Sequence, residues 1–365
     1  MTAGEARAAL DRAFRKAVTP TAAALLDRYR REAAYDESAF PLAPAEFERF
    51  RARATELLLA ALGDPRWRVR EPGPRPSPVA ELFETESLGR LDFQGVRLEP
   101  LTIGIRPTGD RVPAVLCLPT GAGRVPAVAV FSGHSDEGLR DLVLNADSYQ
   151  RGLAVRLARA GFAALAVEKI DAGYLSRGFH AGAAGGDDEV PIATFLLAVG
   201  APTVAARQVM ASVSALEYLA GHPRVDPARI GAAGVSFGGW SAVYAAVLSD
   251  RAAAVADFGR KTQLIDFDPA RFRGVEDYSH LFPGLAALGQ RNLLPLVLAP
   301  RPLCLGHGRA DAESDRQSFE AFRRPLAAQY RALGAERNLE YHVHPGGDVL
   351  PEAAVLGFFA RVFAG

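Results

Sequence analysis

One serine in this chain stands in a setting that suits covalent catalysis. Ser236 lies in the stretch Gly234-Val235-Ser236-Phe237-Gly238, which has the spacing G-x-S-x-G. The apolar residues before it are typical of a strand, and the small residues 239–246 are typical of a helix packed close to a sheet. A serine on such a strand-to-helix turn exposes its hydroxyl as a nucleophile, and glycines leave room for close backbone. The alternative is an ordinary turn with an inert serine.

The bulk composition excludes several classes of protein. The chain has 365 residues, 49% of them hydrophobic, enough for one large α/β domain with an appended segment. Basic and acidic residues balance at 42 each, which argues against nucleic-acid binding and against an electrostatic membrane anchor. The first residues lack a secretory signal, and no apolar run would span a membrane. Cys117 and Cys304 lie in apolar runs, so we expect buried free thiols in a cytoplasmic protein.

The chain divides into three regions. Residues 1–65 predict an N-terminal helical segment whose third helix runs from about Pro44 to Leu62. Residues 66–90 form a connector rich in proline and arginine. Residues 91–365 predict the main α/β domain. The N-terminal helices either pack on this domain or mediate homo-oligomer formation, and the sequence leaves both open.

Apolar strands alternate with helices in the main domain. An antiparallel pair over 96–105 and 112–118 opens it. The later strands are expected at 127–131, 163–167, 230–234, 253–257, 302–305 and 339–343. The helices are expected near 149–159, 204–220, 238–248, 319–333 and 352–363. Near-continuous apolar strands separated by helices predict a mostly parallel central sheet with helices on both faces.

At this point the chain resembles the α/β-hydrolase superfamily, in particular the dienelactone hydrolase and acetyl xylan esterase-like branch. Besides the serine turn, four stretches carry the resemblance: Val130-Phe131-Ser132-Gly133-His134, Val225-Asp226-Pro227-Ala228-Arg229-Ile230, Ala299-Pro300-Arg301-Pro302-Leu303 and His344-Pro345-Gly346-Gly347-Asp348. The resemblance covers roughly residue 91 to the C-terminus and implies the α/β-hydrolase fold. Arg229 is expected to brace the strand that leads to the serine turn.

The resemblance also implies roles for particular residues, in the chain order nucleophile, acid, histidine. Ser236 is then the nucleophile. Asp311, which follows the next-to-last strand, is the acid, with Asp315 as a substitute and helix capping as the structural alternative. The backbone N–H groups of Phe237 and His134 would form the oxyanion hole.

The position of the catalytic histidine holds a carboxylate. Similar proteins have Gly-Gly-His after the last strand, whereas this chain has Gly-Gly-Asp348. A carboxyl group with a pKa of about 4 is a poor base for a hydroxyl, and Asp348 would also meet the like charge of Asp311. Three interpretations stay open. His344 or His342 takes over, the protein uses chemistry without the usual triad, or the histidine was deliberately replaced.

Two long connections, about 168–203 and 258–298, are predicted as cap or lid insertions beyond the strand ends. The candidate pocket residues, each with core packing as the alternative, are Tyr174, His180, Trp240, Tyr278 and His280. The acidic run 187–189 is expected to be a solvated loop. No metal and no cofactor is predicted.

The sequence therefore predicts a serine hydrolase, similar to carboxylesterases, that acts on a small ester through an acyl-enzyme. Its partner would be a small-molecule ester or a biosynthetic intermediate, such as an acetylated sugar. Several alternatives are kept. One is a lyase, cyclase or acyl-transfer enzyme of the same fold that uses Asp348 as a general acid or base. The others are an inactivated variant and a non-catalytic ligand-binding relative.

Overall fold

The computed structural model describes residues 37–70, 72–73, 75–121, 123–182, 202–259, 293–311 and 316–364, with the single residues 7, 196, 200 and 288. The two helices expected within residues 1–36 lie outside these ranges. So do the acidic run 187–189, Tyr278, His280 and Asp315.

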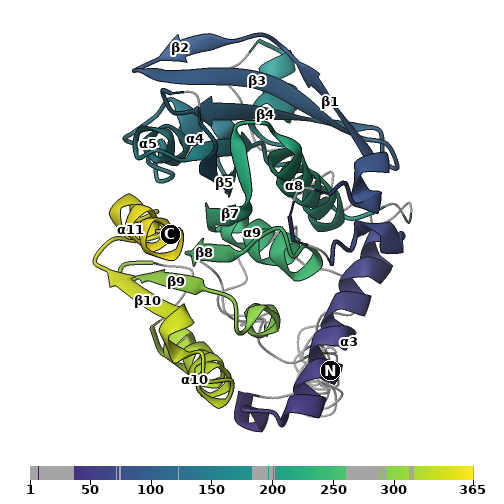
Figure 1. The fold of residues 1–365 in the computed structure, drawn as a ribbon, viewed down its shortest axis with the longest axis vertical. Coiled ribbons are helices and arrows are strands. Elements are labelled where there is room, and N and C mark those ends of the chain that lie inside the picture. Colours follow the sequence, from purple (N-terminus) through teal and green to yellow (C-terminus); the bar gives the residue numbers. More distant parts are fainter. Residues whose placement is uncertain are drawn as a thin grey trace.

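The described residues form a ten-stranded sheet in the order β1-β3-β4-β6-β5-β7-β8-β9-β10, with β2 paired to β3 (Figure 1). The antiparallel part contains β1 (Phe83–Ser87), β2 (Leu91–Phe93), β3 (Val96–Ile105) and β4 (Asp110–Leu118). The parallel part contains β5 (Val125–Phe131), β6 (Ala163–Val167), β7 (Val225–Val235), β8 (Ala254–Phe258), β9 (Leu303–Gly308) and β10 (Leu339–His344). The predicted sheet, mostly parallel and opened by an antiparallel pair, is confirmed.

Helices cover both faces of this sheet because its central strands are apolar on both sides. One face carries α3 (Pro44–Leu62), α8 (Val204–Gly221), α9 (Phe237–Leu248) and α10 (Arg316–Ala332), and the other carries α4 (Leu139–Val143), α5 (Leu153–Arg159) and α11 (Glu352–Val362). Short helical turns complete the chain: η1 (Glu37–Ala39), η2 (Pro65–Trp67), η3 (Pro78–Glu81), η4 (Gly173–Leu175), α6 (Arg177–His180), η6 (Leu294–Leu298) and η7 (Glu336–Asn338). The helix expected from about residue 149 begins only after Gly152, whose φ of 59° is outside the helical range.

The connector expected at 66–90 contributes to the sheet. Its strand β1 pairs with β3, so that Phe83 lies opposite Ile105. The Ser77 N–H donates to Glu217 Oε1 at 2.9 Å, and Glu217 is itself paired with Arg251 in the interior. These partners are far away in the sequence, so the proline-rich composition alone did not reveal the strand.

The strand ends define one rim of the sheet. Phe131 of β5 lies opposite both Val167 of β6 and Gly234 of β7. The loops that follow these three parallel strands therefore leave the sheet at the same level. Ligands of open α/β sheets bind at this carboxyl edge.

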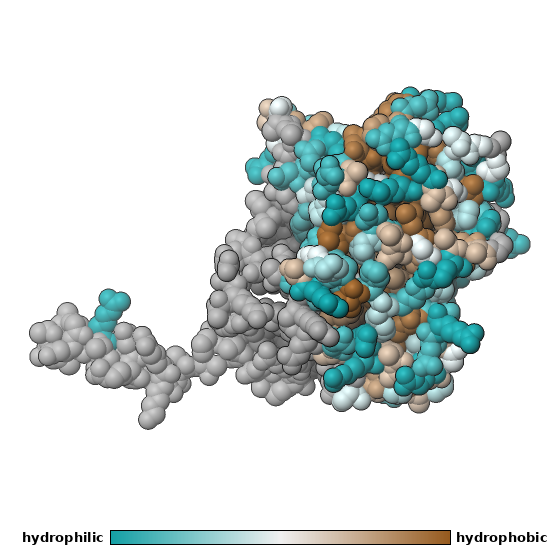
Figure 2. All heavy atoms as spheres, turned by 90° about the vertical axis from the view of Figure 1, so that its left-hand side faces the viewer, coloured by the Kyte–Doolittle hydropathy of each residue, from teal (hydrophilic) through white to brown (hydrophobic). Residues whose placement is uncertain are grey.

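The surface on the side that faces left in Figure 1 carries scattered hydrophobic patches among hydrophilic side chains (Figure 2). Among the described residues, no helix is both long and apolar enough to cross the bilayer. Cys117 and Cys304 are free and buried, as predicted, and burial raises the pKa of each thiol to about 12.

Helix α3 is part of the main core, which makes a stability prediction possible. Leu58 of α3 is fully buried in the cluster that also contains α8 and α9. We expect Leu58→Ala to lower the free energy of unfolding by about 2–5 kcal/mol, because a buried cavity is left behind. Glu56→Ala, at an exposed position of the same helix, should change it by less than about 0.5 kcal/mol. Urea denaturation measures both. Equal effects would mean that α3 is not packed in the core.

Candidate active site

Ser236 occupies the turn between β7 and α9 in a conformation that few residues adopt. Its φ is 57° and its ψ is −128°, a backbone that costs a non-glycine residue about 1–3 kcal/mol. The Ser236 N–H donates to the carbonyl of Phe258 at 2.8 Å, and its own carbonyl accepts from the Gly239 N–H at 3.0 Å. These bonds hold the strained serine at the carboxyl end of β7.

The glycines around Ser236 are required by space. A Cβ on Gly234 would overlap with the backbone of Gly238. A Cβ on Gly238 would overlap with the carbonyl of Phe131 at the end of β5, and one on Gly239 with the carboxylate of Asp257. The first turn of α9 therefore lies directly against the ends of β5 and β8, which is possible only without side chains at these positions.

Phe237 and His134, the two expected oxyanion donors, lie close together. Phe237 is the first residue of α9, and its ring meets the His134 ring edge to face at 5.3 Å between centroids. The Nζ of buried Lys169 lies 5.4 Å from the centroid of the Phe237 ring. The first N–H groups of a helix have no partner within the helix, and the helix dipole favours negative charge there. The N-terminus of α9 can therefore stabilise an anion.

Gln150 closes the loop that carries His134, and the sequence analysis missed it. Its fully buried amide accepts from the Gly133 N–H at 3.0 Å. The same amide donates to Ser132 Oγ and to the carbonyl of Gly138, each at 3.3 Å. Nothing in the spacing around Gln150 marks it, because its partners lie elsewhere in the sequence.

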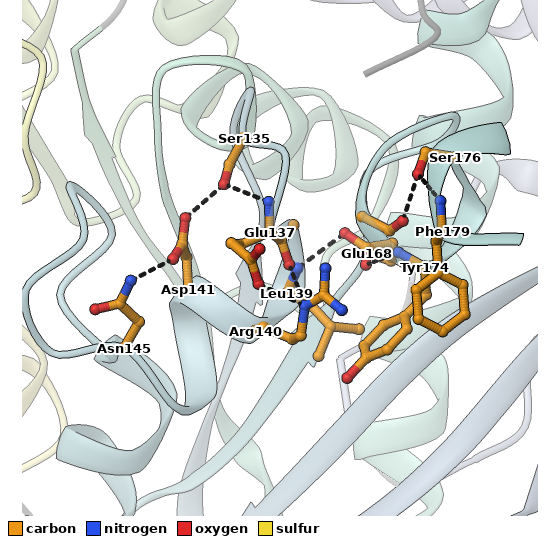
Figure 3. Close-up of polar contacts among 12 residues, drawn as sticks. Ser135, Glu137, Leu139, Arg140, Asp141, Asn145, Glu168, Tyr174, Ser176 and Phe179 are labelled. Carbon is orange, nitrogen blue, oxygen red and sulfur yellow. Dashed lines mark hydrogen bonds and ion pairs between the residues drawn. The ribbon is translucent and has the colours of Figure 1, made fainter. Parts of the chain in front are cut away.

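Glu168 is a second buried polar residue that the sequence analysis did not select. Its carboxylate accepts from the backbone N–H groups of Leu139 at 2.9 Å, Lys169 at 3.1 Å and Tyr174 at 3.1 Å (Figure 3). Burial raises the pKa of Glu168 to about 7, although these N–H bonds and the charge of Arg140 pull it down. One feature of the sequence could have identified Glu168, because it is a charged residue that directly follows the fully apolar strand β6.

The expected pocket residues occupy different environments. Tyr174 is half-buried, its ring meets Phe179 edge to face at 5.0 Å, and the Arg140 guanidinium lies 4.7 Å from the ring centroid (Figure 3). His180 is exposed at the end of α6. Trp240 is only 3% exposed and packs in the core of α9 beside Tyr244. Of the two alternatives for Trp240, a pocket residue or a core residue, the structure shows core packing.

The loops after β9 and β10 lie against each other. The Ala310 N–H donates to the carbonyl of Gly346 at 3.0 Å. A Cβ on Gly347 would lie 4.0 Å from the Cα of Asp311. Asp311 and Asp348, the expected acid and the residue in the histidine position, thus belong to adjoining loops.

Asp348 reaches toward the serine turn. Its Oδ1 lies where a Cβ on Gly259 would stand, and Gly259 has a φ of 63°. The side chain of Val235 approaches the same point, with its Cγ2 3.1 Å from it. The Asp348 carboxylate therefore lies near the residue that directly precedes Ser236.

His344 and His342 lie on one face of β10, as their spacing predicts, with ring centroids 6.3 Å apart. His344 is buried, and burial lowers its pKa, with smaller contributions from the charges of His342 and His307. A lowered pKa keeps the imidazole neutral at pH 7, the form in which a histidine accepts a proton.

Two further side chains have structural contacts. Arg229 Nε pairs with Asp226 at 2.7 Å and its Nη1 donates to the carbonyl of Phe363 at 3.3 Å, which confirms its expected bracing role. Asp257, missed by the sequence analysis, is buried beside the first turn of α9. Within the described ranges, no group of three or more His, Cys, Asp or Glu residues could hold a metal ion.

The chain is similar to known proteins both in sequence and in structure. Residues 112–268 match the sequence model of the dienelactone hydrolase family. No curated protein matches the chain. One similar solved structure is a protein from Bacteroides fragilis assigned as an acetyl xylan esterase, with 17% identity and a TM-score of 0.67 over 89% of this chain and 82% of that one.

Two other solved structures are similar. A methylesterase has 20% identity and a TM-score of 0.66, over 93% of this chain and 68% of that one. A glucuronoyl esterase from Solibacter usitatus has 16% identity and a TM-score of 0.53, over 86% and 92%. At these identities the structures establish the fold, which is that of the α/β hydrolases. The match to the dienelactone hydrolase model covers residues 112–268, less than half of the chain, and is a similarity of that segment.

The raised pKa of Glu168 predicts how stability depends on pH. The folded protein keeps a proton on Glu168 up to about pH 7, whereas the unfolded chain releases it near the ordinary value of 4.5. Rising pH therefore favours unfolding, and the free energy of unfolding should fall by about 3 kcal/mol from pH 4 to pH 8 relative to Glu168→Gln. Urea denaturation across this range measures it. The lowered pKa of His344 makes the free energy of unfolding rise with pH. This contribution is the same in the wild type and in Glu168→Gln, so it cancels in the comparison. Parallel curves would show that Glu168 has no raised pKa.

Proposed function

We propose that this protein is a serine esterase that cleaves a small carboxylic ester, such as an acetylated sugar, through an acyl-enzyme. The observation that carries the proposal is the strained turn at Ser236, with φ 57° at the start of α9 and no room for a Cβ on either flanking glycine. Strain of this kind persists where a function requires it. A nucleophile elbow is such a function, because it presents the hydroxyl at the rim of the sheet.

The proposed reaction has two steps. Ser236 Oγ attacks the ester carbonyl and loses its proton, and the alcohol leaves with a proton as the C–O bond to it breaks. Water then attacks the acyl-enzyme and releases the acid and the free serine. In both steps the carbonyl oxygen becomes negative, and the N–H groups of Phe237 and His134 would stabilise it. One such donor is worth about 3 kcal/mol in the transition state.

The proton acceptor is the unusual part of the proposed site. Asp348 stands in the sequence position of the histidine, and its carboxylate lies beside Val235 and Gly259. Asp311 would be the neighbouring acid, because it lies on the loop that adjoins the loop of Asp348. A carboxylate removes a hydroxyl proton less readily than an imidazole does, so the proposed enzyme is slow.

The relatives support the kind of substrate. The similar structures are named as an acetyl xylan esterase, a methylesterase and a glucuronoyl esterase, all of them esterases. A small-molecule ester is therefore the proposed partner of this chain. The buried free thiols of Cys117 and Cys304 fit a reducing compartment. The proposed location of the protein is therefore the cytoplasm.

A second candidate follows from the carboxylate at position 348. An enzyme of the same fold could use Asp348 as a general acid or base in a lyase, cyclase or acyl-transfer reaction. This candidate predicts no turnover of p-nitrophenyl esters, and loss of the native reaction in Asp348→Ala.

The proposed nucleophile can be tested directly. We expect a fluorophosphonate to label Ser236, because Oγ displaces fluoride from phosphorus and leaves a stable phosphonyl adduct. Mass spectrometry of the digested protein locates the adduct, and Ser236→Ala, which keeps the backbone turn, should remain unlabelled. A folded wild-type protein that stays unlabelled after prolonged incubation would contradict the proposal.

The position of the base can be tested by restoring the imidazole. Removal of a triad member costs on the order of 10⁴–10⁶ in turnover, so Asp348→His should raise the hydrolysis of short p-nitrophenyl esters at least about 10³-fold. Asp348→Asn, of the same size and neutral, should bring no gain. If His344 serves as the base, Asp348→His brings no gain and His344→Gln abolishes the activity of the unaltered chain.

A further inference from the structure

Two buried polar side chains outside the proposed catalytic set hold the loop 132–138, which carries His134. Gln150 and Glu168 are both fully buried. Gln150 bonds to the backbone at both ends of this loop, and Glu168 accepts from Leu139, the first residue of α4, which directly follows the loop.

Gln150 joins the beginning of the loop to its end. Its amide accepts from the Gly133 N–H and donates to the Gly138 carbonyl. One buried side chain therefore bonds to both ends of the loop. Its third bond, to Ser132 Oγ, fixes the residue at the end of β5. The residues between these points are thereby confined to a closed loop.

Glu168 holds the same loop from the other side. It accepts the N–H of Leu139, which directly follows the loop, and the N–H of Tyr174 in the loop after β6 (Figure 3). Its carboxylate fills the space where side chains at Gly138 and Gly173 would stand, and both glycines have positive φ. The two loops are therefore locked to each other around one carboxylate.

The backbone that carries Glu168 is fixed as well. Gln208 of α8 accepts from the Ile170 N–H at 2.8 Å and donates to the Glu168 carbonyl at 3.2 Å. Glu168 is thus anchored from α8 on one face of the sheet, while its side chain bonds to the start of α4 on the other.

Contacts inside the loop leave little freedom around His134. The Ser135 hydroxyl donates to Asp141 and accepts from the Glu137 N–H at 3.1 Å. His134 therefore lies between Gly133, held by Gln150, and Ser135, held by α4. Its ring rests against Phe237.

We propose that Gln150 and Glu168 are positioning residues that hold the His134 N–H at the distance from the Phe237 N–H that an oxyanion requires. The inference rests on the proposed esterase function. Its physical reason is preorganisation, because fixed donors stabilise developing charge without first having to reorient. A displacement of about 1 Å can cost up to about 10²-fold in rate.

Amide hydrogen exchange tests the holding role without any need for activity. In Gln150→Met the Gly133 N–H loses its acceptor, and in Glu168→Gln an amide nitrogen replaces one of the two accepting oxygens. In both variants we expect exchange in peptides covering 133–139 to become about tenfold faster. Peptides from β7 and α8 should keep the wild-type rate. Gln329→Met is the matched control: Gln329 is a buried glutamine that accepts the Leu42 N–H at 2.8 Å, in a different part of the protein. Unchanged exchange in 133–139 would overturn the inference.

The rate of fluorophosphonate labelling at Ser236 tests the effect on the oxyanion. The phosphoryl oxygen of the probe takes the place of the ester oxygen. In both variants we expect the maximal labelling rate to fall about 10- to 100-fold while the half-saturating probe concentration stays the same. Gln329→Met should label like the wild type. A variant with faster loop exchange but wild-type labelling would show that the role is structural only.

The two measurements also separate this inference from the proposed function. Absence of labelling in the wild-type protein contradicts the serine esterase, whatever the exchange data show. Normal wild-type labelling that neither variant slows leaves the esterase standing and overturns the positioning role. Because Gln150→Met removes three hydrogen bonds, circular dichroism first establishes that it folds, and the more conservative Glu168→Gln provides the independent comparison.

Discussion

The close approach of α9 to the ends of β5 and β8 is the constraint on which the rest of the site depends. The first turn of the helix touches the Phe131 carbonyl and the Asp257 carboxylate, with no space for a Cβ at Gly238 or Gly239. That contact is possible only if the chain turns sharply out of β7, and Ser236 absorbs the turn with a positive φ. The energy stored at this residue is compensated by backbone hydrogen bonds and by dense packing around it.

The parallel sheet then determines what can surround the serine. Because β5, β6 and β7 end at the same level, the loops that follow them form one rim with Ser236. The loops after β9 and β10 complete it and bring Asp311 and Asp348 onto adjoining segments. Each of these strands leads into a loop at the rim. Replacing a single residue of such a loop can therefore change the chemistry that the proposed site supports, while the sheet stays the same.

The rim is rich in carboxylates that differ in their surroundings. Glu168 is buried and bonded to three backbone N–H groups, which tie two loops together. Asp348 lies close to the serine turn, where an imidazole would supply a better base. The same functional group therefore has a structural role at Glu168, and at Asp348 it is the group that we propose to take part in proton transfer. The surrounding donors and the neighbouring charges set this difference.

Local sequence determined the elements that depend on local patterns. The strand β6 and the helix α3 follow from their apolar residues alone, and the Gly234–Gly238 spacing was enough to place a turn at Ser236. The order of residues along the chain likewise predicted that Asp311 and Asp348 belong to the site, and their roles stay predictions. Tertiary structure alone decided which distant groups meet. Glu168 bonds to a residue 29 positions away and Gln150 to one 17 positions away. A hydrogen bond of this kind leaves no periodic trace in the sequence, because it depends on where two loops leave a sheet.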